Sequence, residues 1–332
     1  MKSLFLAGIA LQLSLPVFGQ SVEELQRRLA DKEAENQQLR QRIEILEREL
    51  TPRRIGRASP APAAADAGDE EDSNRALERT LVRERGLLLS SGTYEVEPNF
   101  VYSHINHDSS AFRRDSFGPG LVLRAGLPWR SQLELSLPYV FEHRRNGTVS
   151  TDSSGFGDWS LGISHQLLNE RSSVPGLIGA INYKPASGRN TVFESATPVA
   201  LGSGFDAVQG ALTAVKRVDP LVFFGNYSFT HNFSSNKNGI KVAPGDAHGL
   251  RFGTILATSP GTSLRAAFNL ILFDKTKFDG VAREDSDDPY GLLQFGGSAV
   301  LTESTALDVL VEAGVTHNAP EYRITVALPI RF

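Results

Sequence analysis

The stretch EYRITVALPIRF, Glu321–Phe332, ends the sequence and decides its fold class. Bulky apolar residues alternate in it with polar or small ones, which is the period of a β-strand with one face in an apolar environment. Its last residue, Phe332, is an aromatic on the apolar face, where Tyr322 and Ile324 also lie. Soluble domains usually end in a polar, frayed tail, so this stretch predicts a fully paired strand with an apolar medium outside it.

The same alternation recurs through residues 90–332, interrupted at regular intervals by turn-forming residues. Links after even-numbered runs are short, and most links after odd-numbered runs are long and polar, among them NHDSSAFRRD (106–115) and RRNGTVSTDSSG (144–155), the second of which is partly strand. This alternation is typical of an outer-membrane barrel, in which both chain ends lie on the short-turn, periplasmic side. The twelve predicted strands span 93–105, 116–129, 131–144, 155–168, 174–186, 206–218, 221–234, 248–258, 262–276, 288–302, 305–318 and 321–332.

A soluble β-sandwich also alternates, so strand length has to separate the two folds. The predicted strands run about eleven to fifteen residues, longer than the usual five or six of globular proteins and sufficient to cross a bilayer at a tilt. Their apolar faces carry aromatics near strand ends, such as Tyr94, Trp129 and Tyr183, as interface girdles do. We therefore predict an all-β transmembrane barrel of about twelve antiparallel strands, closed by pairing of the last strand with the first.

The polar faces of these strands carry full charges in mid-strand, which predicts a polar lumen. The predicted lumen-lining residues are Glu95, Glu97, Arg124, Glu134, Asp158, Arg251, Arg265, Asp308, Glu312 and Arg323.

Composition and the first residues predict an exported protein. The 332 residues carry a net charge of −4, which does not suggest a nucleic-acid partner, and no cysteine, which excludes disulfides, thiolate zinc sites and a cysteine nucleophile. Residues 1–19, MKSLFLAGIALQLSLPVFG, combine a lysine, an apolar run and small residues, which predicts a secretory signal peptide. The alternative is an N-terminal membrane anchor. No later stretch reaches the roughly 18 consecutive apolar residues of a membrane helix.

Residues 20–50 contain no Gly or Pro and place apolar residues at steps of three and four, the seam of a coiled coil. A polar Asn36 in the seam fixes register, and β-branched and Leu positions lean towards two helices without deciding the number. A single solvated helix is the alternative. The predicted oligomerisation residues are Leu25, Leu29, Asn36, Leu39, Ile43 and Leu46.

Residues 51–72 are rich in Pro, Ala, Gly and acidic residues and predict a flexible linker. Residues 73–89, SNRALERTLVRERGLLL, then predict a short helix capped by Ser73 or Asn74 and ended at Gly86, directly before the barrel of residues 90–332. The charged residues of this helix are Arg75, Glu78, Arg79, Arg83, Glu84 and Arg85.

Several stretches resemble known outer-membrane families. The closing strand with Tyr322, Ile324 and Phe332 resembles the C-terminal signal that the bacterial outer-membrane assembly machinery reads. GFGDWSLGISHQLL (155–168) and AINYKPASG (180–188) resemble the outer-membrane transporter family related to phenol meta-pathway proteins.

The order of segments resembles the functional-amyloid (Fap) secretion channel: signal, coiled coil, linker, short helix, then a barrel that opens on GTYEVEPNFVYSH (92–104). The resemblance covers essentially the full mature chain. It implies a periplasmic coiled coil that forms a trimer, a helix that plugs the lumen, and secretion of unfolded amyloid subunits after the plug moves.

The charges support a plug on physical grounds as well. Helix arginines could pair with lumen carboxylates, and the wall arginines Arg124, Arg251, Arg265 and Arg323 could take Glu78 and Glu84. The alternative is that these charges hydrate an open channel.

We predict no enzymatic activity. His104 and His107 lie beside Asp108, Ser109 and Ser110, the only cluster that suggests a Ser-His-Asp arrangement, but rim histidines are more often plain interface residues. The acidic REDSDD loop (283–288) matches no defined calcium loop, and no phosphate-binding glycine loop lies between a strand and a helix. No catalytic residue, metal site or cofactor is therefore predicted.

The sequence thus predicts an outer-membrane channel that exports polypeptide through a helix-gated lumen. The predicted partners are the lipid bilayer, the assembly machinery, further copies of the chain and a secreted amyloid-type polypeptide. One alternative is a passive porin or uptake channel for small or hydrophobic compounds. Another is a structural or adhesive barrel whose external loops bind partners.

Overall fold

The computed structural model describes residues 75–107, 112–188 and 201–332. The predicted signal peptide, coiled coil with its oligomerisation residues, and linker therefore lie outside the described residues. One helix, α3 (Arg75–Arg83), precedes a large antiparallel sheet in the described part. No helix among the described residues is long and apolar enough to cross a bilayer.

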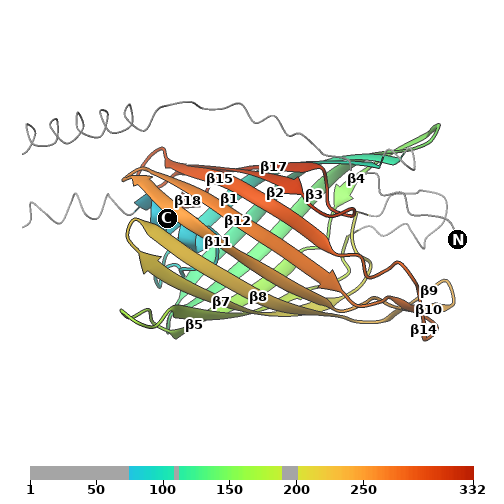
Figure 1. Cartoon of the computed structure of the whole chain (residues 1–332), viewed down its shortest axis with the longest axis horizontal. Helices are drawn as coiled ribbons and strands as arrows, with labels where there is room; N and C mark the ends of the chain where they lie inside the picture. Colours follow the sequence, from blue (N-terminus) through green and yellow to red (C-terminus); the bar gives the residue numbers. More distant parts are fainter. Residues whose placement is uncertain (1–74, 108–111, 189–200) are drawn as a thin grey trace, which may run out of the picture. The chain divides into compact units, whose positions relative to one another are not determined.

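The sheet closes on itself as a barrel (Figure 1). Its strands are β1 (Tyr94–His107), β2 (Phe112–Leu127), β3 (Ser131–Asn146), β4 (Val149–Phe156), β5 (Ser160–Leu168), β6 (Gly176–Lys184), β7 (Ala207–Val218), β8 (Leu221–Asn232), β11 (Ala247–Ser259), β12 (Thr262–Phe273), β15 (Tyr290–Val300), β16 (Ala306–Gly314), β17 (Tyr322–Ala327) and β18 (Ile330–Arg331).

The last strand pairs with the first, as predicted. β17 runs antiparallel to β1 with Tyr322 opposite His104, and β18 continues the pairing with Arg331 opposite Glu95. β4 and β5 both pair with β3, and β17 and β18 both pair with β1. Each of these two pairs therefore counts as one interrupted barrel strand, and the described segments form a barrel of twelve antiparallel strands. This closed twelve-stranded barrel confirms the fold class predicted for residues 90–332.

Strand pairing extends further into two of the long links than predicted, although the second, 144–155, was expected to be partly strand. β1 and β2 pair up to His107 opposite Phe112, inside the stretch expected to be a loop. β3 and β4 likewise form a hairpin with a tight turn at Gly147, where the left-handed φ of 58° suits glycine. The predicted fourth strand is not continuous either, since residues 157–159 interrupt it between β4 and β5.

The two ends of the barrel differ. Links 128–130, 169–175, 219–220, 260–261 and 301–305 lie at one end, which we call the short-turn end. At the other, the long-loop end, two loops carry β9 (Ser235–Lys237), β10 (Ile240–Ala243), β13 (Lys277–Phe278) and β14 (Val281–Ala282). These four form a small sheet of their own in the order β14-β13-β10-β9.

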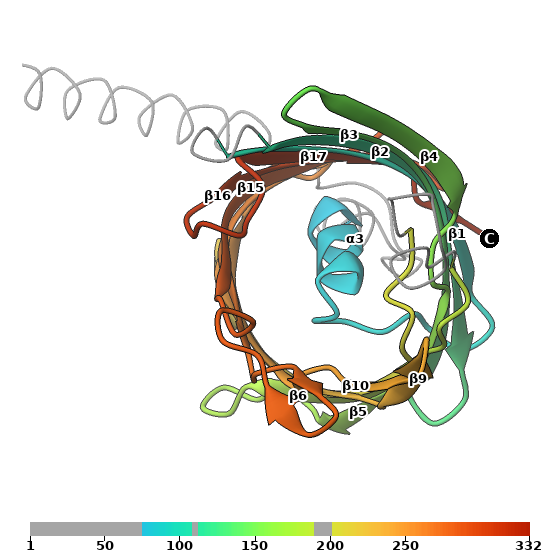
Figure 2. The ribbon, with the colours of Figure 1, turned by 90° about the vertical axis from the view of Figure 1, so that its right-hand side faces the viewer.

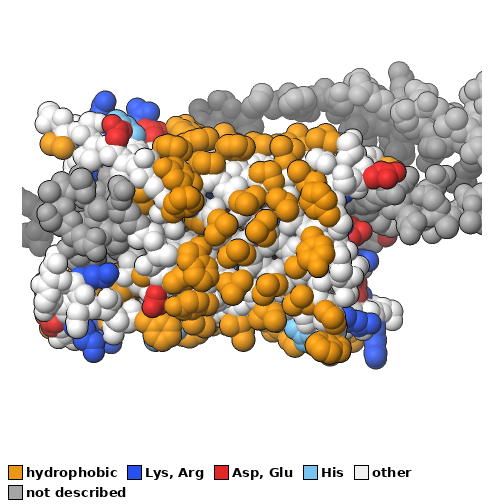
Figure 3. Space-filling view, turned by 180° about the vertical axis from the view of Figure 1, so that it is seen from behind, with side chains coloured by type: hydrophobic (Ala, Val, Ile, Leu, Met, Phe, Trp, Pro, Cys, Tyr) orange, Lys and Arg blue, Asp and Glu red, His pale blue; other side chains and the backbone are white. Residues whose placement is uncertain are grey.

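Side chains alternate between the lumen and the outer face. In β3, Gln132 is buried inside the barrel, while its neighbour Leu133 is exposed outside. Large apolar side chains such as Phe252, Phe295 and Ile181 are more than half exposed on the outer face. Figure 3 shows a broad hydrophobic band between two ends that carry the charged residues. An apolar belt flanked by polar rims is the surface that a bilayer-spanning barrel presents.

Helix α3 lies inside the barrel (Figure 2). Its sequence RALERTLVR contains no Gly or Pro, with Glu78 in the first turn and Arg83 in the last, both favourable to the helix dipole. The helix ends in a Schellman motif, in which Gly86 N–H donates to Leu81 O at 2.8 Å.

The residue with the left-handed backbone in this motif is Arg85, with φ of 58°, and not Gly86, which the sequence predicted as the stop. Gly86 is needed for space, since a Cβ there would lie 2.8 Å from Val215 Cγ2 in the barrel wall. Arginine in this conformation costs about 1–2 kcal/mol, so the contacts of its side chain have to offset that cost.

Candidate functional site

The candidate site is the contact between helix α3, with the residues that follow it, and the lumen wall. Leu81 is buried among Val215, Val222, Phe224 and Ile255, which line the short-turn half of β7, β8 and β11. Burial of a leucine side chain contributes about 1.5–3 kcal/mol. The helix therefore has a hydrophobic seat on one side of the lumen.

A buried polar contact lies beside this seat. Thr80 Oγ1 and Ser263 Oγ of β12 are 2.7 Å apart, and Thr80 also donates to Ala76 O within the helix. Both hydroxyl residues are 1% exposed, so this contact joins helix and wall where water does not reach.

Glu84 binds the wall through both carboxylate oxygens. Oε1 accepts from Arg265 Nη1 of β12 at 2.9 Å, and Oε2 lies 2.7 Å from Arg251 Nη2 of β11. The Glu84 and Arg265 side chains are each 2% exposed. A buried carboxylate is tolerated when opposite charges lie this close to it, here through a hydrogen bond at Oε1 and an ion pair at Oε2.

Asp308 of β16 shares these charges. It pairs with Arg83 of the helix and accepts from Arg265 Nη2 at 2.7 Å. Arg265 therefore bridges a helix carboxylate and a wall carboxylate.

Arg85 reaches a different part of the wall. Its Nη2 donates to Glu134 Oε1 of β3 at 2.7 Å, and the other oxygen of Glu134 accepts from Arg124 Nε at 2.8 Å. Arg124 in turn binds Glu95 at 2.8 Å and Glu97 at 2.7 Å. This acidic cluster, Glu95, Glu97 and Glu134 around Arg124, lies across the lumen from Arg251 and Arg265 in the strand order.

The helix also contacts the rim of the short-turn end. Glu78 accepts from Arg331 Nη1 at 2.8 Å, and Arg331 Nε donates to Glu95 at 3.1 Å. Arg79 donates to backbone carbonyls of Glu303 at 2.6 Å and Ser304 at 3.1 Å, and more distantly to Pro329 O. The carbonyls belong to the β15–β16 turn and to the interruption between β17 and β18.

The predicted helix–wall pairs are thus placed as follows. Glu84 is bound by Arg251 and Arg265, as predicted. No helix carboxylate is bound by Arg124 or Arg323. Arg323 forms two contacts with Glu312, one of them 2.7 Å from Nη2, and Arg331 is the partner of Glu78. The side chain of Arg75 lies outside the description.

Sequence reasoning missed the neutral members of the site. Gln132 Oε1 accepts from Leu89 N at 2.9 Å, and Gln294 Oε1 accepts from Arg251 Nε at 2.9 Å. Both glutamines are 3–5% exposed. Their place on the polar face of each strand could have predicted that they point into the lumen, but only charged residues were chosen as lumen-lining residues.

Asp158 does not contact the helix, although the sequence placed it with the lumen charges. It lies in the interruption between β4 and β5 and binds Lys184 at 3.2 Å, Gly188 N at 2.8 Å and Ser203 N at 2.7 Å. It therefore holds both described ends of the loop that joins β6 to β7. The stretches 155–168 and 180–188, noted above for their resemblance, meet at this aspartate.

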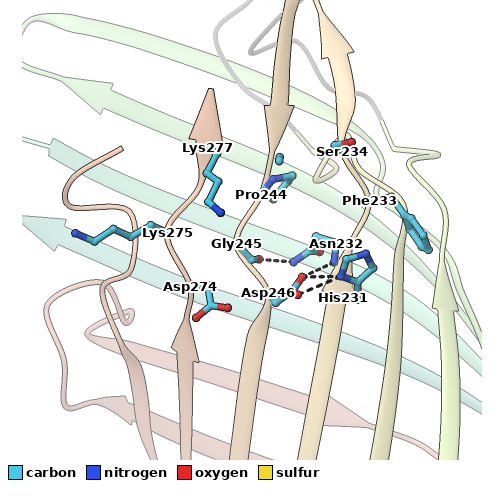
Figure 4. A pocket seen from close by; sticks show the side chains of 11 residues that line it. His231, Asn232, Phe233, Ser234, Pro244, Gly245, Asp246, Asp274, Lys275 and Lys277 are labelled. Carbon is cyan, nitrogen blue, oxygen red and sulfur yellow. Dashed lines mark hydrogen bonds and ion pairs between the residues drawn. The ribbon is translucent and has the colours of Figure 1, made fainter. Parts of the chain in front are cut away.

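Two cavities stand out in the described part. One, of about 290 Å³, lies in the lumen against Arg83 and Glu84 and is lined from the wall by Arg251, Arg265, Asn269, Gln294, Glu312 and Arg323, among others. The other, of about 540 Å³, lies at the long-loop end between the β8–β11 and β12–β13 connections (Figure 4). There His231 Nδ1 lies 2.9 Å from Asp246 Oδ1, and Lys275 and Lys277 line the far side.

Histidine–aspartate pairs recur near the long-loop end. His104 pairs with Asp115 at 2.7 Å and stacks on Tyr322 at 5.3 Å. The side chain of His107 and residues 108–111 lie outside the described residues, so the suggestive grouping with Asp108, Ser109 and Ser110 stays untested. Within the described ranges, no three His, Cys, Asp or Glu side chains converge on a point where a metal ion could bind.

No family model matches the chain. Among solved structures, the COG4313 outer membrane channel from Pseudomonas putida F1 is similar, with a TM-score of 0.64 and 16% identity over 74% of this chain and 97% of that one. The NanC porin and the translocator domain of the autotransporter NalP from Neisseria meningitidis each match with a TM-score of 0.44 and 7% identity. They cover 71% and 81% of this chain, and 98% and 99% of their own.

At 16% identity, the first likeness establishes the fold. The described chain has the architecture of an outer-membrane β-barrel, with a helix from its own N-terminal side held in the lumen by two sets of charges.

Proposed function

We propose that this protein is an outer-membrane channel whose lumen is closed by helix α3 and opens when the helix leaves. The observation that carries the proposal is the attachment of one short segment to opposite walls, through Glu84 on one side and Arg85 on the other. A segment held in this way crosses the path that a solute would take. The mechanism is passage through a polar lumen, without covalent chemistry.

The wall charges support a helix that can leave. Asp308 keeps Arg265 when Arg83 departs, and Glu134 keeps Arg124 when Arg85 departs. Because breaking a buried pair costs about 3–5 kcal/mol when one charge is left alone, partners within the wall lower the cost of release. The hydrophobic seat of Leu81 opposes release and favours the closed state.

The cargo that we propose is an unfolded polypeptide of the secreted amyloid type, exported from the periplasm. This rests on the resemblance of the segment order to the Fap secretion channel. In the same proposal, residues 20–50 form a trimeric periplasmic coiled coil, and the assembly machinery reads Tyr322, Ile324 and Phe332. The apolar belt of Figure 3 meets the outer-membrane bilayer.

The test is a redox lock, since the sequence contains no cysteine that would compete. In Thr80→Cys/Ser263→Cys the two thiols replace hydroxyls that are 2.7 Å apart, close enough for a disulfide between helix and wall. Single-channel current in planar bilayers should show few openings when the pair is oxidised and more after reduction. Each single-cysteine variant is the matched control and should not respond to redox state.

A second variant covers the case in which the lock fails to form. Deletion of residues 20–86 removes the helix and should give a continuously open conductance. A current that changes neither with oxidation of the Thr80→Cys/Ser263→Cys pair nor with the deletion would contradict the gated channel. A current that is already large in the full chain and unaffected by the lock would instead favour the passive porin, and no current in any variant would favour the structural barrel.

A further inference from the structure

Glu84 occupies what is, in chemical terms, a carboxylate receptor. Two guanidinium groups on neighbouring strands each contact one carboxylate oxygen: Arg265 Nη1 donates a hydrogen bond at 2.9 Å, and Arg251 Nη2 forms an ion pair at 2.7 Å. Arginine pairs that approach both oxygens of a carboxylate are selective for that group. The bound carboxylate is almost fully buried, so the receptor is formed inside the lumen and not at its rim.

Contacts within the wall hold the two arginines in place without Glu84. Arg265 is fixed by Asp308 at 2.7 Å. Arg251 donates to Gln294 Oε1 at 2.9 Å, and its Cζ lies 5.6 Å from the ring centroid of Phe224. The receptor therefore keeps its geometry when the helix moves away, as a preorganised binding site requires.

Space and charge beside Glu84 also suit an anion. The lumen cavity of about 290 Å³ adjoins the carboxylate. Its wall contributes three arginines, Arg251, Arg265 and Arg323, against Glu312, which pairs with Arg323, and Asp308, which pairs with Arg265, so one positive charge is in surplus. A surplus of positive charge in a confined, partly dry space attracts anionic groups strongly.

We infer that Arg251 and Arg265 form a binding site for a carboxylate of the transported solute, and that Glu84 fills this site while the channel is closed. A solute carboxylate and Glu84 compete for the same two arginines, so binding of the solute favours release of the helix. The inference rests on the proposed function, because it assumes that the helix leaves. It adds a ligand class, an acidic side chain or chain terminus of a polypeptide, or a small carboxylate.

The first experiment is chemical rescue in the full chain. Glu84→Ala leaves the two arginines facing an empty space, so acetate or formate should raise its thermal unfolding midpoint in detergent by several degrees over chloride at equal ionic strength. Wild type, whose site is filled, should not respond. Glu78→Ala, which removes the half-exposed rim carboxylate of the same helix, is the matched control and should not respond either.

Dependence on the arginines decides the outcome. Rescue that disappears in Glu84→Ala/Arg265→Gln and in Glu84→Ala/Arg251→Gln supports the site, while equal rescue in these double variants overturns it. Heat-modifiable migration in gels verifies that each variant is a folded barrel. This readout does not require conduction, so it can succeed or fail independently of the gated channel.

The second experiment identifies the source of the carboxylate. In Glu84→Ala channels, penta-glutamate or succinate added to one side should block the current, and Arg265→Gln should weaken the block at least about tenfold, equivalent to about 1.4 kcal/mol. Block by penta-glutamate alone assigns the site to polypeptide, and block by succinate alone assigns it to small solutes. Block that is unchanged by both arginine substitutions, in channels that do open, overturns the inference and leaves the proposed function intact.

Discussion

Glu84 and Arg85 are consecutive residues whose side chains bind opposite walls of the barrel. Glu84 is held by arginines on β11 and β12, whereas Arg85 binds Glu134 on β3. The opposite charges of the two residues match their neighbours, since Glu84 lies against Arg251 and Arg265 and Arg85 lies against the acidic cluster. The left-handed backbone of Arg85 directs the two side chains apart, so the helix terminus spans the lumen.

The first prediction separates the backbone of Arg85 from its side chain. Arg85→Ala and Arg85→Gly both lose the pair with Glu134, but glycine also relieves a left-handed conformation that costs about 1 kcal/mol or more. We therefore expect the ratio of closed to open channel to be roughly fivefold higher in Arg85→Gly than in Arg85→Ala. Single-channel recordings of the two variants measure this ratio. Equal ratios would show that the backbone conformation carries no strain.

The second prediction concerns the hydrophobic seat. Leu81→Ala should cost the closed state about 2 kcal/mol or more, which raises the ratio of open to closed channel roughly thirtyfold. The barrel itself should keep its heat resistance, because its strand pairing does not involve the helix. Val309→Ala, a similar truncation on the outer face, should leave the open ratio near that of wild type. A Leu81→Ala channel that stays closed would contradict the role of the seat.

The third prediction concerns Arg124 at the centre of the acidic cluster. Arg124→Ala leaves Glu95, Glu97 and Glu134 together in a buried space, which should destabilise the barrel by about 3–5 kcal/mol. Urea unfolding in detergent measures the loss. Arg113→Ala, on an exposed side chain near the long-loop end, should have little effect. An unchanged midpoint in Arg124→Ala would mean that water hydrates the cluster.

The fourth prediction tests the closing strand. Phe332 N donates to Tyr94 O at 2.8 Å and Tyr94 N donates to Phe332 O at 3.1 Å, while the residue as a whole is 73% exposed and accessible to a receptor. A short polar extension after Phe332 should therefore reduce outer-membrane insertion in cells and leave refolding in detergent unchanged. The same extension inserted after Gly147, in the exposed hairpin turn, is the control. Normal insertion of the terminal extension would show that the machinery does not read this end.

The fifth prediction concerns residues 20–50, which lie outside the described residues. A peptide of this segment should sediment as a trimer, and Leu39→Asp should make it monomeric, because a charge in the seam cannot be buried without a partner. Sedimentation equilibrium distinguishes the states. A dimer would contradict the trimer that the Fap resemblance implies, and a monomer would contradict self-association altogether.

The barrel could be predicted because its causes are local and repeated. Alternation of apolar and polar residues places side chains such as Leu133 and Glu134 on opposite faces whatever the register. Strand ends were harder to predict, because residues 106–107, 112–115 and most of 144–155 are paired although they are polar, and hydrophobicity gives no signal there. The interruption at residues 157–159 depends on Asp158 binding a distant loop, which no local pattern encodes.

For the candidate site, the sequence could predict only which charged residues lie on the helix and which line the lumen, and not which of them pair. Composition indicated that helix arginines and lumen carboxylates would meet, but which charges pair depends on the rotation and depth of the helix. The sequence analysis therefore missed Arg331 as the partner of Glu78. It also expected Arg124 to bind a helix carboxylate, whereas Arg124 binds three carboxylates of the wall. Arg79 binds main-chain carbonyls, and these cannot be read from side-chain identity.

The contacts of Arg79 and Glu78 link the position of helix α3 to closure of the barrel. Glu78 accepts from Arg331 of β18, and Arg79 donates to Pro329 O between β17 and β18, so the contacts of the helix include the strands that close the barrel. These contacts are incomplete until β17 and β18 have paired with β1. The full set of contacts that holds helix α3 in the lumen therefore depends on the same two strands that close the barrel.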